Sequence, residues 1–445
     1  MSSSIEVGLA AAGDDALATM QNGRTAEGAA RRPNRWVLAS TVFGSIIEWY
    51  DFYIYGTAAA LVFGRLFFPA TDPNVSTLAA FVTFAIGLFA RPLGGIIFGH
   101  FGDRIGRKSM LLISLILMGI PTVLIGMLPT YQSIGYLAPL SLVFLRIVQG
   151  LALGGEFGGA VLMAVEHSSP TTRSIYGSLP QLGVPGGVLL STGAFALVSR
   201  MNEAEFLNWG WRIPFLAGAI LVIFGVFVRL RIAETPDFEA ARKQGQIEAI
   251  PVVTLLRRRL ATVLLLSGGK LGEVTLFFLT TVYLVSYTTG RLGLPRDFVL
   301  TTIVIAAGVC FVNIPVAGWL GDRFGKRLLY GTGAILLMIV AVPMFSLLET
   351  REPAYVMVAF IVPLGFVFPL MFGPQPSLYA AQFPAALRYT GISLGVALAS
   401  AAGGGLAPVI ATALVASWGN SVPIGYYMAG MAAVSAVSVF LMKRA

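Results

Sequence analysis

Charge is scarce in this sequence. Only 11% of its 445 residues are Asp, Glu, Lys or Arg, whereas a soluble domain carries about 25%. A chain of this length cannot surround its core with so few charges. In addition, 56% of the residues are hydrophobic and the mean hydropathy is +0.80. The composition therefore excludes a soluble protein and predicts an integral membrane protein.

Cysteine and histidine are also scarce. The single cysteine, Cys310, cannot form an internal disulfide, and its apolar neighbours predict that it packs in a helix core. The sequence contains no cluster of metal ligands, no Walker loop and no nucleophile elbow. We therefore expect no enzymatic activity, no metal, no cofactor and no direct use of ATP.

Long apolar runs fill most of the chain. A helix that spans the hydrocarbon core needs about 20 apolar residues. Runs of this length between charges and turn residues predict an all-α membrane protein with twelve transmembrane helices. Their approximate bounds are 36–63, 76–98, 110–128, 138–165, 174–198, 211–230, 260–287, 298–319, 328–347, 354–380, 387–415 and 423–442.

The longest break between these runs divides the chain into two sets of six helices. We expect a disordered tail over residues 1–35, since it lacks the apolar core of a signal peptide. An N-terminal bundle follows over residues 36–230. The loop 231–259 links it to a C-terminal bundle over residues 260–445.

The net charge of +9 is explained by the orientation of the helices. With the N-terminus inside, the two tails and the even-numbered loops hold 21 of the 30 Lys and Arg residues. Cytoplasmic loops of membrane proteins carry such an excess of positive charge. We therefore expect both termini in the cytoplasm, and the charge does not indicate nucleic acid as a partner. The odd-numbered loops hold only Arg65, Arg200, Arg291, Arg296 and Arg351.

One motif occurs twice, at an offset of 219 residues. Residues 99–108 and 318–327 both read Gly-x-x-Gly-Asp-Arg-x-Gly followed by two basic residues, after helices 2 and 8. A second echo, at 170–173 and 384–388, follows helices 4 and 10. Two echoes in register predict two parallel six-helix repeats. Transporters built from such repeats bind their solute at the interface of the halves.

The repeated motif has a physical role at the helix ends. Glycine allows tight turns and close helix approach. Aspartate accepts hydrogen bonds from a helix N-terminus or from an arginine. We interpret the motif as a lock that holds the cytoplasmic face closed, with a basic topology-setting loop as the alternative. Its residues are Gly99, Asp103, Arg104, Gly106, Arg107, Gly318, Asp322, Arg323 and Gly325.

With these motifs the chain resembles the major facilitator superfamily, and within it the metabolite:proton symporter family, in its shikimate permease-like branch. The supporting strings lie mainly in the N-terminal half, at 48–56, 91–95, 146–150, 154–156 and 210–215. The resemblance implies a multi-pass protein of the bacterial inner (plasma) membrane. It also implies transport of shikimate, 2-oxoglutarate, citrate, or zwitterions such as proline and betaine, usually with a proton.

Helix 1 carries two carboxylates one turn apart. Glu48, Asp51 and Tyr55 share one helix face. Two adjacent carboxylates repel when both are ionised, which suits proton coupling; pairing of one of them with an arginine is the alternative. In some members of the superfamily an acid on helix 1 works with an arginine on helix 4, and Asp51 and Arg146 occupy such places. We assign proton coupling to Asp51, Glu48, Glu156 and Arg146.

Other polar residues inside the predicted helices are candidates for the solute site, because charges within a membrane are costly and usually functional. Arg91 is either an anion ligand or an interhelical brace, and Lys270 and Glu273 satisfy each other unless Lys270 faces a cavity. Helix 10 carries a polar and aromatic face, near Pro374 and Pro376, that suits a cavity lining or ordinary packing. We assign substrate binding to Arg91, Arg146, Gln149, Tyr55, Lys270, Glu273, Gln375 and Tyr379.

These observations predict a secondary active transporter that takes up a small organic acid together with a proton. The partners we expect are the solute, protons and the lipid bilayer, and we expect a functional monomer. Transport of a zwitterion, or export by proton antiport, would use the same residue types. A receptor with a transporter fold is disfavoured, because neither the tail 1–35 nor the C-terminus is long enough for a signalling domain.

Overall fold

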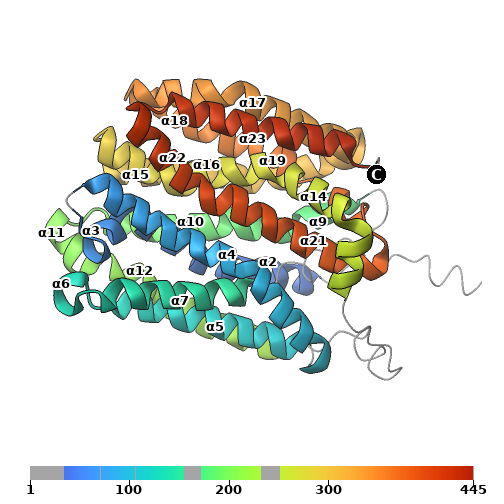
Figure 1. The fold of residues 1–445 in the computed structure, drawn as a ribbon, viewed down its shortest axis with the longest axis horizontal. Coiled ribbons are helices and arrows are strands. Elements are labelled where there is room, and N and C mark those ends of the chain that lie inside the picture. The colour runs from blue at the N-terminus through green and yellow to red at the C-terminus, as the bar shows by residue number, and fades with distance from the viewer. Residues whose placement is uncertain (1–34, 71, 106, 155–171, 232–250, 444–445) are drawn as a thin grey trace, which may run out of the picture.

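The computed structural model describes residues 35–70, 72–105, 107–154, 172–231 and 251–443, and all its regular elements there are helices (Figure 1). In the first half, the six helical stretches are α2 (Arg35–Ala58) with η1 (Ala59–Phe63) and α3 (Gly64–Phe67); α4 (Pro73–Ile105); α5 (Arg107–Met127); α7 (Leu137–Leu153); α9 (Arg173–Ser178) with η2 (Pro180–Leu182) and α10 (Gly183–Val198); and η3 (Phe206–Gly210) with α12 (Arg212–Arg231). The short helices α6 (Tyr131–Ile134) and α11 (Glu203–Glu205) connect them.

The second half repeats this order. Its helical stretches are α14 (Pro251–Phe278) with η4 (Leu279–Tyr283), α15 (Leu284–Ser286) and η5 (Tyr287–Arg291); α16 (Arg296–Phe324); α17 (Lys326–Glu349); α18 (Pro353–Ile361) with η6 (Val362–Val367), α19 (Phe368–Phe372) and α20 (Gln375–Ala380); α21 (Ala385–Ala399) with η7 (Ser400–Gly405) and α22 (Leu406–Trp418); and α23 (Val422–Leu441).

The twelve predicted helices are confirmed. Among the described residues, nine helical stretches are long and apolar enough to cross a membrane, and two shorter apolar ones cover 112–127 and 137–153. The twelfth is the first stretch, formed by α2, η1 and α3. The expected disturbance at Pro374 is present, since α19 ends at Phe372 and α20 begins at Gln375. Helix 4 was predicted to reach residue 165, but residues 155–171 lie outside the described part.

One loop and one helix end differ from the prediction. A short helix begins at Pro251, so the second part of the expected linker loop is helical; non-helical backbone at Arg259 separates it from helix 7, whose expected start at residue 260 agrees with the structure. Proline suits the first position of a helix because its missing N–H has no partner there anyway. The chain kinks at Arg259, where φ is −139°. The repeated motif at 318–324 is also helical and forms the last turns of α16, and the turn begins only at Gly325.

The two halves pack through two equivalent pairs of helices. In Figure 1, α5 and α7 lie at one edge of the bundle and α17 and α23 at the other. Between them, α10 and α9 pack against α16, while α4 packs against η7 and α22. The repeat relates α4 to α16, and α10 to α22. The contact between α10 and α16 therefore corresponds to the contact between α22 and α4. Two parallel repeats related by a two-fold axis are expected to pack in this way.

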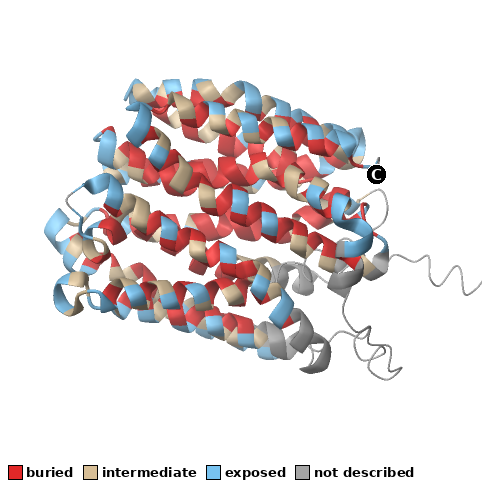
Figure 2. Ribbon diagram, in the orientation of Figure 1, coloured by how far each residue is buried: buried red, intermediate tan, exposed pale blue. Residues whose placement is uncertain are grey.

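Burial follows from this arrangement. Buried residues gather along the middle of the bundle, and exposed ones lie on its outer surfaces and ends (Figure 2). The outer surface is itself apolar: Ile220, Ile223 and Val312 are each more than 60% exposed. Large apolar side chains in contact with solvent are unfavourable in water but match lipid tails. The pattern is that of a bundle surrounded by lipid.

Candidate transport site

A small buried cavity lies between the two halves. Its volume is about 30 Å³, about the volume that one water molecule occupies in the liquid. From the N-terminal half Trp49, Tyr53 and Arg91 line it, and from the C-terminal half Lys270, Glu273 and Phe278 do so, among others. One cation from each half therefore faces the same space. A metabolite does not fit there unless the surrounding side chains move.

The C-terminal wall of the cavity is a closed polar network. The Lys270 ammonium lies 2.5 Å from Glu273 Oε1 and donates to Gln375 Oε1 at 2.9 Å. The Gln375 amide donates to the other oxygen of Glu273, and the Tyr330 hydroxyl lies 2.9 Å from that oxygen. All four side chains are buried. Lys270 and Glu273 therefore contact each other, as the sequence indicated, and both also line the cavity.

Two further contacts extend this network. The Tyr379 hydroxyl lies 3.3 Å from the Tyr330 hydroxyl. Tyr379 therefore belongs to the network, although it does not itself line the cavity. Gln181, in η2 of the other half, donates to the Gln375 side chain at 3.5 Å. The polar face predicted on helix 10 is therefore directed inward, where it touches both halves.

Arg91 and Glu48 are both buried on the N-terminal side. The Arg91 guanidinium lies 5.6 Å from the centre of the Trp49 ring, and both residues line the cavity. Tyr53 stacks on Trp49 with 5.4 Å between the ring centres. The guanidinium thus packs against an aromatic ring at the edge of the cavity, an arrangement of the cation–π type.

Arg146 lies in a separate aromatic cage within the N-terminal half. Its guanidinium carbon is 4.6, 4.2 and 5.0 Å from the ring centres of Phe52, Tyr55 and Phe84. Nη1 donates to Gln149 Oε1 at 3.3 Å, while Nε and Nη2 have no hydrogen-bond partner in the part of the chain that the structure describes. Arg146, Gln149 and Tyr55 do not line the cavity. These three residues are therefore placed beside the cavity rather than in its wall.

Asp51 is buried beside the same cage. Neither carboxyl oxygen has a hydrogen-bond partner among the described residues. The Thr122 hydroxyl is its polar neighbour, but that hydroxyl donates to the Met118 carbonyl and accepts from Gln149. No ion pair among the described residues joins Asp51 to Arg146. The expected pairing of acid and arginine is thus absent from this state, because Arg146 turns toward Gln149 and the aromatic rings.

The repeated motif closes the end of the bundle that carries the basic loops. Asp322 Oδ1 and Oδ2 accept from the Ser174 backbone N–H at 3.0 and 3.1 Å, and Oδ2 accepts from Ile175 N–H at 3.1 Å. Asp322 belongs to α16 and the two amides to α9, so the contact crosses between the halves. This is the contact with a helix N-terminus that the sequence analysis predicts for a motif aspartate.

The glycines of this motif act as expected. A Cβ at Gly318 would lie 2.9 Å from the Ser174 carbonyl oxygen, so α16 and α9 approach this closely only with glycine there. Gly325 has φ of +100°, which side chains other than glycine rarely adopt. Among the described residues, the Arg323 guanidinium packs against aromatic rings, 5.6 Å from the centre of the Trp319 ring and 5.5 Å from that of Phe324.

A second contact between the halves closes the opposite end, where Figure 1 shows α3 and α11. Glu203 lies 2.5 Å from Arg65 and 3.1 Å from Arg296, which belongs to the other half. Arg296 also lies 3.8 Å from the centre of the Phe206 ring. Among the described residues, contacts between the two halves are therefore present at both ends of the bundle, with the small cavity between them.

Comparisons with known proteins identify the family. The family described as "Sugar (and other) transporter" matches residues 37–262 and 256–443. The chain belongs to this family. It is 42% identical over 411 residues to the inner membrane metabolite transport protein YhjE of Escherichia coli, covering 91% of this chain and 93% of that protein. It is 40% identical over 404 residues to the shikimate transporter of Escherichia coli, covering 90% and 92%.

Solved structures agree on the fold. The D-xylose-proton symporter matches with a TM-score of 0.73 over 91% of this chain and 97% of that one, at 18% sequence identity. The resemblance to the major facilitator superfamily and its metabolite:proton symporters is confirmed. The protein is a multi-pass transporter of the bacterial inner membrane and not an enzyme.

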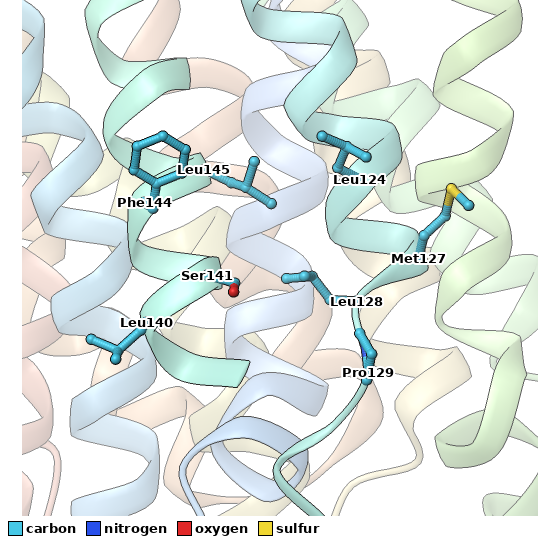
Figure 3. A pocket seen from close by; sticks show the side chains of 8 residues that line it. All are labelled: Leu124, Met127, Leu128, Pro129, Leu140, Ser141, Phe144 and Leu145. Atoms are coloured by element: carbon cyan, nitrogen blue, oxygen red, sulfur yellow. The ribbon is translucent and has the colours of Figure 1, made fainter. Parts of the chain in front are cut away.

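A second, wider hollow on this transporter lies on the outside of the bundle. It has a volume of about 500 Å³ and lies between α5 and α7, where Figure 3 shows Leu124, Met127, Leu140 and Phe144 around it. These four side chains are between 43% and 64% exposed on the outside of the bundle. The lining contains no ionisable group, so it offers nothing to hold an organic ion and suits a lipid chain instead.

Some predicted site residues of the transporter lie beyond what the structure describes. Gly106 and Glu156 lie outside the described residues, and for Gly99, Asp103, Arg104 and Arg107 only the helical backbone is described. Conversely, sequence reasoning missed Gly87, Tyr330, Gln181 and Phe278. A buried tyrosine or phenylalanine in an apolar helix gives no signal of its own, since its role depends on a neighbour from a distant helix.

Gly87 holds the space that Arg146 occupies, and we expect Gly87→Ala to displace that arginine. A Cβ at position 87 would lie 2.5 Å from Arg146 Nε and 3.0 Å from its Cδ. Overpacking of this kind typically costs about 1–3 kcal/mol. We expect a lower melting temperature in detergent and a strong loss of proton-coupled uptake. The control is Gly308→Ala, where a Cβ meets nothing within 4 Å; equal losses in both variants would contradict this role.

Asp322 is expected to control the rate of the transport cycle rather than solute binding. Asp322→Asn replaces a charge-assisted contact to two amides by a neutral one, at a cost of roughly 1–2 kcal/mol, or about 5- to 30-fold in the closed population. We expect a comparable fall in exchange rate with unchanged solute affinity. Asp297→Asn is the matched control, because Asp297 is exposed at the opposite end of the same helix. Loss of binding at unchanged turnover would contradict the assignment.

Proposed function

We propose that this transporter takes up a small organic acid together with a proton, by alternating access. The observation that carries the proposal is the placement of Arg91 and Lys270, one from each half, on the wall of one buried cavity. A solute that bridges two cations of different halves draws those halves together. Its binding then favours an occluded state, in which both halves close around the solute.

The charges around the cavity favour an anion. Arg91 and Lys270 both line the space, so the carboxylate of an anionic solute would find one cation on each side of it. A carboxylate binds a guanidinium through two parallel hydrogen bonds and an ammonium as a point charge. The 40% identity with a shikimate transporter supports a hydroxylated carboxylate of that class, and 2-oxoglutarate or citrate presents the same chemistry.

Asp51 is the group that we assign to the proton. A buried carboxyl without a hydrogen-bond partner is far cheaper to hold neutral than ionised, because an unpaired buried charge costs several kcal/mol. The surroundings of Asp51 therefore accommodate the protonated acid. Two of the three guanidinium nitrogens of Arg146 have no hydrogen-bond partner among the described residues, so they can receive the carboxylate after the proton leaves. Glu48 and Glu156 are the next candidates for this role.

The two closed ends account for alternating access. We propose that the Asp322 contact opens toward the cytoplasm, where the basic loops place both termini, and that the Glu203 contact opens to the outside. The repeat predicts the role of Asp322 for Asp103 as well. The cavity lies within a single chain, which supports a functional monomer.

The proposal is tested in proteoliposomes with an imposed pH gradient. The wild-type protein is expected to accumulate one of a panel of labelled organic acids when the outside is acidic, and to lose this accumulation when a proton ionophore is added. Accumulation only when the gradient is reversed would indicate an exporter that works by antiport. Transport of every acid without any response to the gradient would refute proton coupling.

A zwitterion is the second candidate solute. Glu273 faces the cavity beside Lys270, so the wall also offers an acceptor for a substituted ammonium. The chain is 33% identical over 423 residues to a proline/betaine transporter of Escherichia coli, and it covers 83% of that protein. Proline and betaine therefore belong in the same panel.

A further inference from the structure

Three phenylalanine rings lie between the cavity and Arg146. Phe278 lines the cavity and contacts Phe52 and Phe84, with ring centres 5.8 and 5.5 Å apart. Phe52 and Phe84 contact each other at 5.2 Å. These same two rings cover the Arg146 guanidinium on their other side. The three rings are named here the aromatic layer.

The aromatic layer is built from both halves. Phe52 and Phe84 come from α2 and α4, are buried and do not line the cavity, whereas Phe278 ends α14 in the other half. Relative movement of the halves must therefore move Phe278 with respect to the other two rings. Admission of a solute has the same effect, because a space of about 30 Å³ cannot take a metabolite unless a lining side chain moves.

Phe278 has one neighbour that determines its position. Its ring occupies the place of a missing side chain at Gly404 in η7, where a Cβ would lie 2.6 Å from the ring atoms Cδ2 and Cε2. Irregular helical turns of this type are frequent at functional sites. The ring is therefore held between the phenylalanines of one half and a glycine turn of the other.

We propose that Phe278 is a positioning residue for coupling: it closes the aromatic layer between the solute cavity and the Asp51–Arg146 proton site until solute enters. The inference rests on the proposed function and adds the element that ties the two sites together. Closed apolar rings exclude water, and exclusion of water prevents proton leakage. When solute displaces Phe278, the Phe52 ring loses its support, and Arg146 becomes free to move toward Asp51.

The test measures proton flux and solute flux separately in proteoliposomes that contain a pH-sensitive dye. Phe278→Ala is expected to raise proton influx in the absence of solute by on the order of tenfold, because water then reaches the proton site. The number of protons moved per solute is expected to deviate from the wild-type value. Phe278→Leu retains apolar bulk, so its proton influx is expected to lie between those of the wild-type protein and Phe278→Ala. It replaces the alanine variant in the test if that variant does not fold.

Two other variants separate coupling from cavity shape. Phe368 lines the same cavity, and its aromatic neighbours among the described residues are Phe277 and Phe372, not the rings over Arg146. Phe368→Ala is expected to change solute affinity, with solute-free proton influx unchanged. In Gly404→Ala the added methyl group pushes the Phe278 ring toward Phe52 and Phe84. This variant is expected to exchange solute more slowly, without an increase in solute-free proton influx.

The inference would be overturned if Phe278→Ala and Phe278→Leu both showed the wild-type proton influx in the absence of solute and the wild-type number of protons moved per solute. An equal leak in Phe368→Ala would overturn it too, since the effect would then be one of cavity volume. Failure of the proposed function looks different: the wild-type protein itself would show no uptake driven by a pH gradient.

Discussion

Asp51→Asn is expected to abolish accumulation of solute driven by a pH gradient. A one-proton symporter concentrates its solute about tenfold for each pH unit, because one unit corresponds to about 1.4 kcal/mol per proton. Asparagine is neutral at every pH and fits the unpartnered position of Asp51. The variant should therefore equilibrate its solute without concentrating it, while exchange between labelled and unlabelled solute stays measurable. Uptake and counterflow in the same proteoliposomes provide both readouts.

The control for this experiment is Glu48→Gln, one helical turn away. It changes the same chemistry on the same face and is expected to have the smaller effect on coupling. Accumulation by Asp51→Asn that equals the wild-type value under a pure proton gradient would remove Asp51 from the mechanism. Glu48 and Glu156 would then be examined in its place.

Lys270→Gln is expected to weaken binding of an anionic solute by about 10- to 150-fold, since a hydrogen bond to a charged group contributes about 1.5–3 kcal/mol. The ammonium is the cation of the C-terminal wall, and the neutral amide does not replace its charge. Solute affinity is measured directly on purified protein, apart from turnover. Arg212→Lys is a suitable control, because Arg212 donates to the carbonyls of Gly126 and Leu128 and lies outside the cavity.

Glu273→Gln distinguishes the two solute classes. An anion is expected to bind as well as before or better, because the variant removes a negative charge from the cavity wall. A zwitterion is expected to bind more weakly, because its cationic group loses an acceptor. The double variant Lys270→Gln with Glu273→Gln keeps the charge balance of the network and should fold at least as well as Lys270→Gln alone. Unchanged affinity in Lys270→Gln would contradict the proposed site.

Local chemistry made several parts of this structure predictable. The spacing of Lys270 and Glu273 on one helix face was enough to predict their contact. The repeated aspartate and glycines were enough to predict a contact with a helix N-terminus, found here for Asp322. These features depend on residues near in sequence or on a repeated pattern, so composition and spacing specify them.

The rest depends on how distant helices meet. Asp51 and Arg146 lie on neighbouring elements, yet Arg146 turns to Gln149 because Gly87 leaves room for that rotamer. The contact of Phe278 with Gly404 joins residues 126 positions apart, and the cluster of Arg65, Glu203 and Arg296 joins the short helices α3 and α11 to the start of α16. No local pattern encodes such contacts, which arise only after the helices have packed.

The duplicated motif has an evolutionary consequence. Asp51 stands 52 residues before the motif aspartate Asp103, and Lys270 stands 52 residues before its repeat, Asp322. Tandem duplication of an ancestral six-helix gene would make Asp51 and Lys270 descendants of a single codon. One descendant became an acid and the other a base, on the first helix of each half. The division of labour between proton and solute then began as divergence at one ancestral position.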